Sequence, residues 1–279
     1  IGAYIKVLWW TKNFEIARWE NVDLLAAIQK KSRKLMMSDA YIVDGYSLSE
    51  PGKIAEDARL VVVGDVIYKV YTVNAVKTDA SKYDEYNCYK LAIARWNSIS
   101  FEWENIGLID DNGFNDMSYA VFASDDSLEI VFTQQTEKMN AEKSADIYAS
   151  LANLSVKRAV ISKDSSEIAV DSVYQSQTYK YLVCNDIING VPVAVWAENS
   201  DNNMFGVSPQ NYIDAKGVSH VFETTANSIW MSRFENGKWS QPYCVQSGLS
   251  AITGIAIDGN GCIAYIVDTN GDLADLTDR

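Results

Sequence analysis

A pair of short apolar segments joined by a tight polar turn occurs four times in this chain, and this repeat constrains the fold more than any other feature. Segments rich in β-branched and aromatic residues between turn residues are typical of strands. We therefore expect four β-hairpins, which we call inner hairpins, at residues 58–73, 118–134, 179–197 and 252–268. Their turns contain residues that permit tight reversal of the backbone, namely Gly64-Asp65, Asp125-Asp126, Asn189-Gly190 and DGNG at 258–261.

A second pattern lies between the inner hairpins. Each copy is a segment that ends in an aromatic residue or leucine and runs into an asparagine-containing turn, at residues 14–23, 90–100, 146–155 and 228–240. The last copy contains Asn236-Gly237, a strong hairpin signal because both residues tolerate the positive φ of a type I′ turn. A second strand is expected after each copy, in LLAAIQ, WENIGLI, VKRAVIS and QPYCVQS. We call these pairs outer hairpins.

Inner and outer hairpins alternate along the chain with a period of about 60 to 70 residues. Units of four antiparallel strands repeated radially are the signature of a β-propeller. We therefore predict an all-β fold, a β-propeller of four-stranded antiparallel blades in which four to five blades are visible. Residues 1–279 are expected to form a single propeller domain or part of a larger ring.

The ends of the chain leave ring closure open. The C-terminal inner hairpin could pair with the N-terminal outer hairpin and remove the exposed sheet edges, leaving one extra strand at 3–10. Alternatively, further blades lie outside this sequence. Because the chain starts at Ile1 and stops at Arg279 without an obvious terminal element, we expect it to be one module of a longer chain, or a processed protein.

Irregular insertions are expected near residues 22–57 and 207–226, where the spacing departs from a regular blade. Residues 22–37, VDLLAAIQKKSRKLMM, combine good helix formers with Asn21 or Asp23 as a capping residue. This segment is either an inserted helix or, in its first part, the second strand of the first outer hairpin.

The charge of the chain excludes several classes of partner. With 24 Lys and Arg against 37 Asp and Glu, the net charge is −13. Phosphate binding needs clustered positive charge, so no nucleic acid is expected as a partner. No apolar run reaches the roughly 18 residues of a transmembrane helix, so no membrane-spanning segment is expected.

The cysteines and the single histidine limit metal and redox chemistry. The four cysteines are far apart and lack CxxC spacing, so neither a zinc site nor a dense disulfide framework is indicated. Apolar neighbours favour four buried free thiols, with one disulfide as the alternative, for Cys88, Cys184, Cys244 and Cys262. His220 is the only histidine, which makes a His-rich metal site impossible and argues against a His-based catalytic triad.

The acidic stretch DTNGDLADLTD at 268–278 raises the question of a calcium loop. An EF-hand-type loop needs glycine at position 6 and a carboxylate at position 12. Counted from Asp268, these positions hold Leu273 and Arg279, which argues against an EF-hand. A simpler calcium site formed by Asp268, Asn270 and Asp272 remains a hypothesis, and no other cofactor is expected.

The loops that follow the inner hairpins are all polar: NAVKTDASKYDEYN at 74–87, QQTEKMNAEKSAD at 134–146 and ENSDNNMFG at 198–206. Such loops project from the same face of a propeller, and insertions on one face often mark the binding face. Acidic loop residues and partly exposed tryptophans therefore form the candidate ligand-binding set Asp79, Asp84, Glu198, Asp201, Trp10 and Trp103. Solvated turns, and packing between blades for the tryptophans, are the alternatives.

A polysaccharide-active enzyme is the alternative function. Glycosidases use carboxylates about 5 to 9 Å apart, and the carboxylates near inner strands are Asp65, Asp125, Asp126, Glu129, Asp186, Glu198 and Asp258. Most of them occupy turns, where Asp is favoured by turn chemistry alone. Because no family signature accompanies them, no catalytic residue is assigned.

Three segments carry a resemblance to known proteins: VPVAVWAENSDNN at 191–203, SIWMSRFENGKWSQP at 228–242 and IAYIVDTNGDLADLTDR at 263–279. They resemble predicted propeller blades in large secreted or surface-anchored proteins of anaerobic Gram-positive bacteria, some of which also carry dockerin or cell-wall modules. The resemblance implies an extracellular or cell-surface location and no known reaction. We therefore expect a non-catalytic binding or scaffold protein with a carbohydrate or protein ligand.

Overall fold

The computed structural model describes residues 55–75, 83–84, 87–124, 126–138, 153–163, 165–202, 212–213, 219–220 and 225–268. The regular elements in these ranges are β-strands. Predictions for residues 1–54, including the strand at 3–10, the outer hairpin at 14–23 and the helix at 22–37, lie outside them. Within the described part of the chain, no helix is long and apolar enough to cross a membrane.

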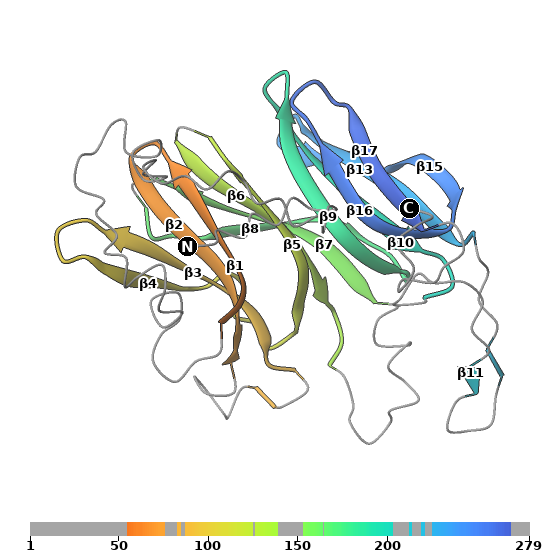
Figure 1. Cartoon of the computed structure of the whole chain (residues 1–279), viewed down its shortest axis with the longest axis horizontal. Helices are drawn as coiled ribbons and strands as arrows, with labels where there is room; N and C mark the ends of the chain where they lie inside the picture. The colour runs from red at the N-terminus through yellow and green to blue at the C-terminus, as the bar shows by residue number, and fades with distance from the viewer. Residues whose placement is uncertain are drawn as a thin grey trace, which may run out of the picture.

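Three sheets have four principal strands in antiparallel order (Figure 1). Blade I contains β1 (Ala55–Val63), β2 (Val66–Asn74), β3 (Tyr89–Asn97) and β4 (Glu102–Leu108). Blade II contains β5 (Asp116–Ala123), β6 (Ser127–Gln135), β7 (Leu154–Ser162) and β8 (Ala169–Gln175). Blade III contains β9 (Tyr179–Ile188), β10 (Val191–Asn199), β13 (Asn227–Glu235) and β15 (Tyr243–Leu249).

Two smaller features accompany these sheets. The short β14 (Lys238–Trp239) pairs with the end of β13. Blade IV contains β16 (Ala251–Ile257) and β17 (Ile263–Asp268), which pair antiparallel. The predicted all-β fold with four-stranded antiparallel blades is therefore confirmed.

The first strands of successive blades lie beside one another: β1 contacts β5, β5 contacts β9, and β9 contacts β16 (Figure 1). These strands form the inner side of the array, whereas β4, β8 and β15 are the last strands of their blades. β15 is exposed along most of its length, as expected of an outer strand. This radial order of meander sheets is that of propeller blades.

In all four blades, a β-bulge or similar register shift interrupts the pairing of the first strand with the second. Such β-bulges bend a strand and increase its twist. The shifts fall between Glu56 and Arg59, Asp116 and Tyr119, Val195 and Ala197, and Ile252 and Gly254. The recurring position gives a structural reference for aligning the blades.

The tight turns have the expected backbone geometry. Asn189 and Gly190 have φ of 52° and 78°, and Asn236 and Gly237 have φ of 54° and 75°. Positive φ at both central residues is what a type I′ hairpin turn requires. These two hairpin predictions are therefore confirmed.

The prediction for the third outer hairpin, at 146–155 and VKRAVIS, is wrong in its strand positions. VKRAVIS belongs to β7, the third strand of blade II, and the fourth strand is β8. Most side chains of β8 are exposed or half-buried, and only Val173 is buried. An outer strand of this kind lacks the apolar alternation by which strands are predicted from sequence.

The core lies between neighbouring blades. The second strands β2, β6 and β10 are buried along nearly their whole length, as predicted for the inner hairpins. Trp196 of β10 is fully buried and belongs to a cluster that also holds Val131 of blade II and Ile252 of blade IV. Each blade is therefore stabilised by burying apolar surface against the next one.

The insertion expected near 207–226 lies between β10 and β13. Its described residues form β11 (Tyr212–Ile213) and β12 (Ser219–His220), which pair antiparallel outside the four-stranded sheet. Their place in the chain confirms that blade III carries an insertion between its second and third strands.

Candidate functional site

Long connections leave blades I, II and III at the same edge. In Figure 1, β2, β6 and β10 run to the lower edge, whereas the turns that join them to β1, β5 and β9 lie at the upper edge. A backbone hydrogen bond joins the two ends of each connection, and we call this bond a closure. The bonds run from Ala75 N to Cys88 O (2.7 Å), Thr136 N to Asn153 O (3.0 Å) and Ser200 N to Ala226 O (3.1 Å). We call the edge defined by these three closures the loop face.

Buried amide side chains lie next to the closures. Asn199 Nδ2 donates to Asn227 Oδ1 (2.9 Å), which also accepts the Tyr181 hydroxyl (2.7 Å). In blade II, Asn115 Nδ2 donates to Gln135 Oε1 (2.8 Å). Because buried polar groups are stable only when paired, these contacts hold the ends of the strands in fixed positions, and the loops leave a rigid base.

A buried polar network at the loop face joins blades I and II. Lys90 Nζ of β3 donates to Asp116 Oδ1 of β5 (2.9 Å) and to Phe114 O (2.8 Å). Both side chains of this ion pair are fully buried. Asp116 also accepts the Leu91 N–H (2.9 Å) and the Gln134 Nε2 (2.6 Å), so the carboxylate holds three donors. The pair fixes the first strand of blade II against the third strand of blade I.

Burial shifts the pKa of each partner in the direction that favours its neutral form. Desolvation raises the pKa of Asp116 and lowers the pKa of Lys90. Their mutual attraction and the hydrogen bonds to the carboxylate oppose both shifts. Hydrogen bonds and an opposite charge favour the charged forms, and this balance is what keeps a buried ion pair stable.

The network continues to the surface through the connection between β4 and β5. Asn112 Nδ2 donates to Gln134 Oε1 (2.7 Å) and to Asp110 Oδ2 (3.2 Å). Lys157 Nζ of β7 donates to the same Asp110 oxygen (2.6 Å). Sequence reasoning missed these residues, although the pattern Asp-x-Asn-Gly at 110–113 also occurs at 258–261 and 268–271. Lysine ammonium groups therefore bind Asp110 Oδ2, from Lys157, and Asn112 Oδ1, from Lys90 (3.5 Å).

Glu198, a predicted ligand-binding residue, is buried between blades II and III, with 8% of its surface exposed. Its Oε2 accepts the indole N–H of Trp196 (3.2 Å). Lys180 lies directly opposite it in the pairing of β9 with β10. The Lys180 ammonium donates to the carbonyl oxygens of Thr178 (2.9 Å) and Ser176 (3.3 Å) and to the Thr178 hydroxyl (3.2 Å).

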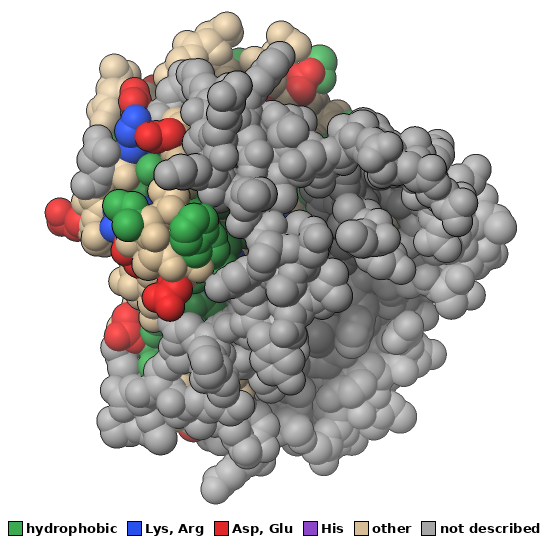
Figure 2. Space-filling model, turned by 60° about the vertical axis from the view of Figure 1, so that its left-hand side comes forward, with side chains coloured by type: hydrophobic (Ala, Val, Ile, Leu, Met, Phe, Trp, Pro, Cys, Tyr) green, Lys and Arg blue, Asp and Glu red, His purple; other side chains and the backbone are tan. Residues whose placement is uncertain are grey.

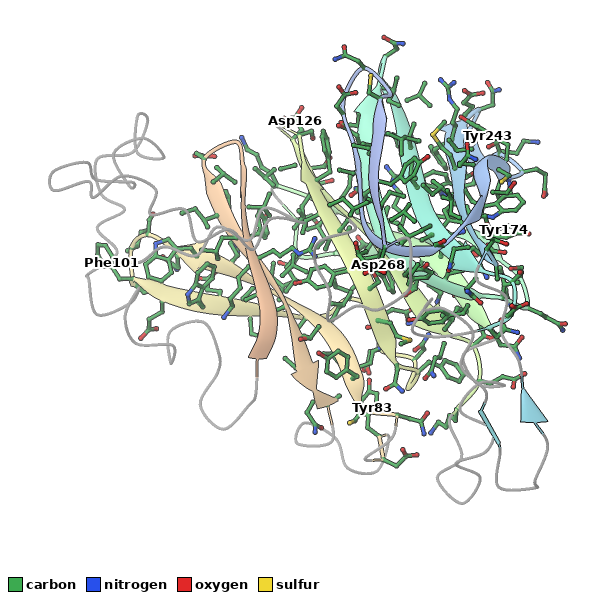
Figure 3. The ribbon with its side chains drawn as sticks, turned by 45° about the vertical axis from the view of Figure 1, so that its right-hand side comes forward. Tyr83, Phe101, Asp126, Tyr174, Tyr243 and Asp268 are labelled. Atoms are coloured by element: carbon green, nitrogen blue, oxygen red, sulfur yellow. The ribbon has the colours of Figure 1, made fainter. Side chains whose placement is uncertain are left out.

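An aromatic ring also lies near the Lys180 ammonium. The Tyr174 ring of β8 lies 5.7 Å from the ammonium and stacks on Trp196 with centroids 5.8 Å apart (Figure 3 labels Tyr174). Burial lowers the pKa of Lys180 to about 8, against the opposing effect of the Glu198 charge. A lysine desolvated in this way loses its proton at a lower pH than an exposed lysine.

Unlike Glu198, the other predicted binding residues that the structure describes are exposed or partly exposed. Asp84 is exposed, and its Oδ1 accepts the backbone N–H of Asn87 (2.9 Å). Asp201 is partly exposed, and its N–H donates to Asn199 Oδ1 (3.0 Å). Trp103 is half-buried against Trp96, with centroids 5.3 Å apart. Asp79, Trp10, Asn270 and Asp272 lie outside the described residues.

Asp268 is fully buried at the end of β17, opposite Ala251 of β16 (Figure 3 labels Asp268). Among the residues that the structure describes, no group of three or more His, Cys, Asp or Glu side chains is arranged to hold a metal ion. The proposed partners of Asp268 in a calcium site are not described, so the calcium hypothesis stays a prediction.

The carboxylates considered for catalysis fall mainly at the edge opposite the loop face. Asp65 and Asp126 are exposed beside the turns of blades I and II, and Figure 3 shows Asp126 at the upper edge and Tyr83 at the lower one. Asp258 accepts the N–H of Cys262 (2.8 Å) and Asn260 (3.0 Å), which lowers its pKa and confirms its predicted role in the turn. Glu129 is paired with Arg158 (2.8 Å) inside blade II.

All four cysteines are free thiols. Cys88 and Cys184 are buried as predicted, and burial raises the pKa of Cys184 to about 12. The prediction of burial is wrong for Cys244 and Cys262, which are exposed. Cys244 lies on the outer strand β15, and Cys262 follows the turn between β16 and β17.

The described surface of blade I shows scattered charge rather than one charged patch. In Figure 2, acidic side chains occur singly on this side, with a small group of hydrophobic side chains between them. Scattered side chains of this kind are normal on a protein surface. The loop face, and not this side of the molecule, is therefore the candidate binding surface.

Comparisons with known proteins concern the fold only. The sequence matches no known family and no curated protein. Trypanosoma rangeli sialidase is similar in structure with a TM-score of 0.43 and 10% identity, over 77% of this chain and 35% of that chain. The same enzyme with 2,3-difluorosialic acid gives a TM-score of 0.42 and 10% identity, over 77% and 34%. The chain spans about a third of the length of these sialidase chains, and similarity at this level says nothing about its ligand.

Proposed function

We propose that this protein is a non-catalytic binding domain that holds a carbohydrate or protein ligand on its loop face. The observation that carries the proposal is the set of three equivalent closures at one edge, at Ala75, Thr136 and Ser200. Each closure lets a long segment leave a blade without disturbing its strands. Loops displayed from one edge of a rigid scaffold commonly carry binding residues.

The composition of the displayed segments supports the same proposal. The segments 75–88, 136–153 and 200–226 each contain three acidic residues and at most two basic ones. Carboxylates accept hydrogen bonds from hydroxyl and ammonium groups, so these segments suit a hydroxyl-rich sugar or a cationic protein surface. They repel polyanions. With the resemblance to surface proteins of Gram-positive bacteria, this supports a secreted or cell-surface setting.

Binding can be tested with the whole 279-residue chain on an array of immobilised glycans, with and without calcium. The informative variant is Asp79→Asn with Asp201→Asn, which removes two charges from the predicted binding loops. Its matched control is Asp65→Asn with Asp126→Asn, which removes two charges at the opposite edge. The proposal expects loss of glycan signal in the first variant only. Equal loss in both variants would show a general charge effect and contradict a loop-face site.

A second experiment tests whether the ligand is a protein. An array of cationic peptides replaces the glycans, with the same two variants. Signal on the peptides and none on the glycans identifies the ligand class as protein. Absence of signal on both arrays, from folded protein, would contradict the proposal.

A further inference from the structure

The second strand of blade IV is exposed where the equivalent strands of the other blades are buried. Aligning the blades at the recurring bulge places Ile266 with Val70 of blade I and Val195 of blade III. Tyr265 then corresponds to Lys69 and Ala194, which are 1% and 0% exposed, yet Tyr265 is 40% exposed. Within the described residues, β17 pairs with β16 only. In the described part of the chain, the other edge of β17 therefore has no paired strand.

The third strands of blades I and III share a sequence signature. In β3 it reads Ile93-Ala94-Arg95-Trp96, and in β13 it reads Met231-Ser232-Arg233-Phe234. The order is an aliphatic residue, a small residue, arginine and an aromatic ring. The chain contains this signature once more near its N-terminus, as Ile16-Ala17-Arg18-Trp19, which is identical to the copy in β3.

The signature has the same register in both blades. Ile93 faces Val70, and Met231 faces Val195. The small residues Ala94 and Ser232 face the next position, Lys69 and Ala194. The arginines then face Tyr68 and Val193. The signature is thus tied to a fixed position beside the bulge and not merely to strand formation.

The aromatic ring faces a tryptophan of the next strand in both blades, and each arginine pairs with a glutamate, on the next strand in blade I and on the same strand in blade III. Arg95 pairs with Glu104 (3.0 Å), and Arg233 pairs with Glu235 (3.1 Å). Trp96 packs against Trp103, and Phe234 packs against Trp239, each with centroids 5.3 Å apart. The N-terminal copy is followed by Glu20, at the position that Glu235 holds after Phe234.

We propose that residues 14–19 of the same chain form the third strand of blade IV and dock on the outer edge of β17. The register of the other blades assigns Ile16 to Ile266, Ala17 to Tyr265 and Arg18 to Ala264. This pairing covers Tyr265 and joins the N-terminal part of the chain to its C-terminal part. It goes beyond the proposed binding function, which does not depend on it.

A cysteine pair tests the register directly. Ala17→Cys with Tyr265→Cys is introduced into the full chain after the native cysteines are replaced by Cys88→Ala, Cys184→Ala, Cys244→Ser and Cys262→Ser. Directly opposed residues have Cβ atoms about 4.5–5.5 Å apart, close to the reach of a disulfide. The matched control is Ala17→Cys with Val267→Cys, a diagonal pair about 7–8 Å apart. Peptide mapping after mild oxidation of dilute protein reports the bonds.

The proposal expects a disulfide within one chain between positions 17 and 265, formed at least tenfold faster than the control bond. Equal rates, or no bond in a folded protein, would overturn it. A bond formed only between two chains would show that a second copy supplies the strand, which also overturns it. Should the cysteine-free background fail to fold, amide hydrogen exchange of the unmodified protein decides. Residues 14–19 must then be protected to the same degree as β17, and rapid exchange of these residues would refute the docking.

Discussion

Lys90 of blade I and Asp116 of blade II form an ion pair with 2.9 Å between Nζ and Oδ1, and neither side chain is exposed. The pair lies at the edge from which the long loops leave. Removing one partner of a buried pair leaves an uncompensated charge, which costs about 3–5 kcal/mol. The relative position of two blades therefore depends on this contact.

We predict that Lys90→Met lowers the free energy of unfolding by about 3–5 kcal/mol, because Asp116 then remains buried without its cation. Lys90→Met with Asp116→Asn is expected to be more stable than Lys90→Met alone, because no buried charge is left. Urea denaturation monitored by tryptophan fluorescence measures both. The control is Glu104→Gln, which breaks the partly exposed pair with Arg95 and is expected to change little. Additive effects of the two buried substitutions would contradict this account.

We predict that the protein becomes more stable as the pH rises from 7 to 9. The pKa of Lys180 is about 8 when folded, below its ordinary 10.5, so the folded state binds fewer protons than the unfolded state in this range. Stability then increases with pH, on the order of 1 kcal/mol by pH 9. Burial also lowers the pKa of Lys90, which acts in the same direction.

The variant Lys180→Met isolates the contribution of Lys180. Urea midpoints at pH 7 and pH 9 should differ less in this variant than in the unmodified protein. The range stops at pH 9 because burial raises the pKa of Cys184 and Tyr179 to about 12, and these groups lower stability above their ordinary pKa values of 9.0 and 10.0. An unchanged pH dependence in Lys180→Met would contradict the assignment.

Substitution by alanine should have opposite effects on stability at two glycines in turns. Gly190 has a φ of 78° and no atom within 4 Å of an added Cβ, so Gly190→Ala is opposed by backbone strain alone and should cost about 1–2 kcal/mol. Gly259 has equal space and no such positive φ. Gly259→Ala should be neutral or stabilising by up to about 1 kcal/mol, because it restricts the unfolded chain. Thermal unfolding of both variants tests the turn geometry, and a stabilising Gly190→Ala would contradict it.

Thiol reactivity should divide the cysteines into two pairs. Cys244 and Cys262 are exposed and should react with a thiol reagent in the native protein. Cys88 and Cys184 are buried and should react only after unfolding. Mass spectrometry of the labelled peptides before and after addition of urea gives the result. Labelling of Cys184 in the native state would contradict the packing between blades.

The sequence predicts the inner hairpins well because their turns and apolar strands are local signals. Asn189-Gly190 and the buried strand β10 are examples. β8 was missed because an outer strand with exposed side chains has no strong apolar period. Cys244 was misjudged for a related reason, since the apolar residues of β15 are exposed on an outer strand.

The candidate site was harder to predict than the fold. Lys90 and Asp116 are 26 residues apart and meet only because two blades pack together, which no local pattern reveals. Glu198 was expected on the surface because it begins a polar loop segment in the sequence. In the structure β10 continues to Asn199, so Glu198 is still within the strand and packs beside Trp196 and opposite Lys180.

The loops that leave the blades at the loop face are proposed to bind the ligand. The closure between Ser200 N and Ala226 O (3.1 Å) allows residues 201–225 to be replaced by a short Gly-Ser linker. The most direct test is binding of this variant to the glycan and cationic-peptide arrays, beside its thermal unfolding curve. The account predicts loss of binding by at least tenfold with an unchanged unfolding temperature. Full binding by the shortened chain, at unchanged stability, would contradict it.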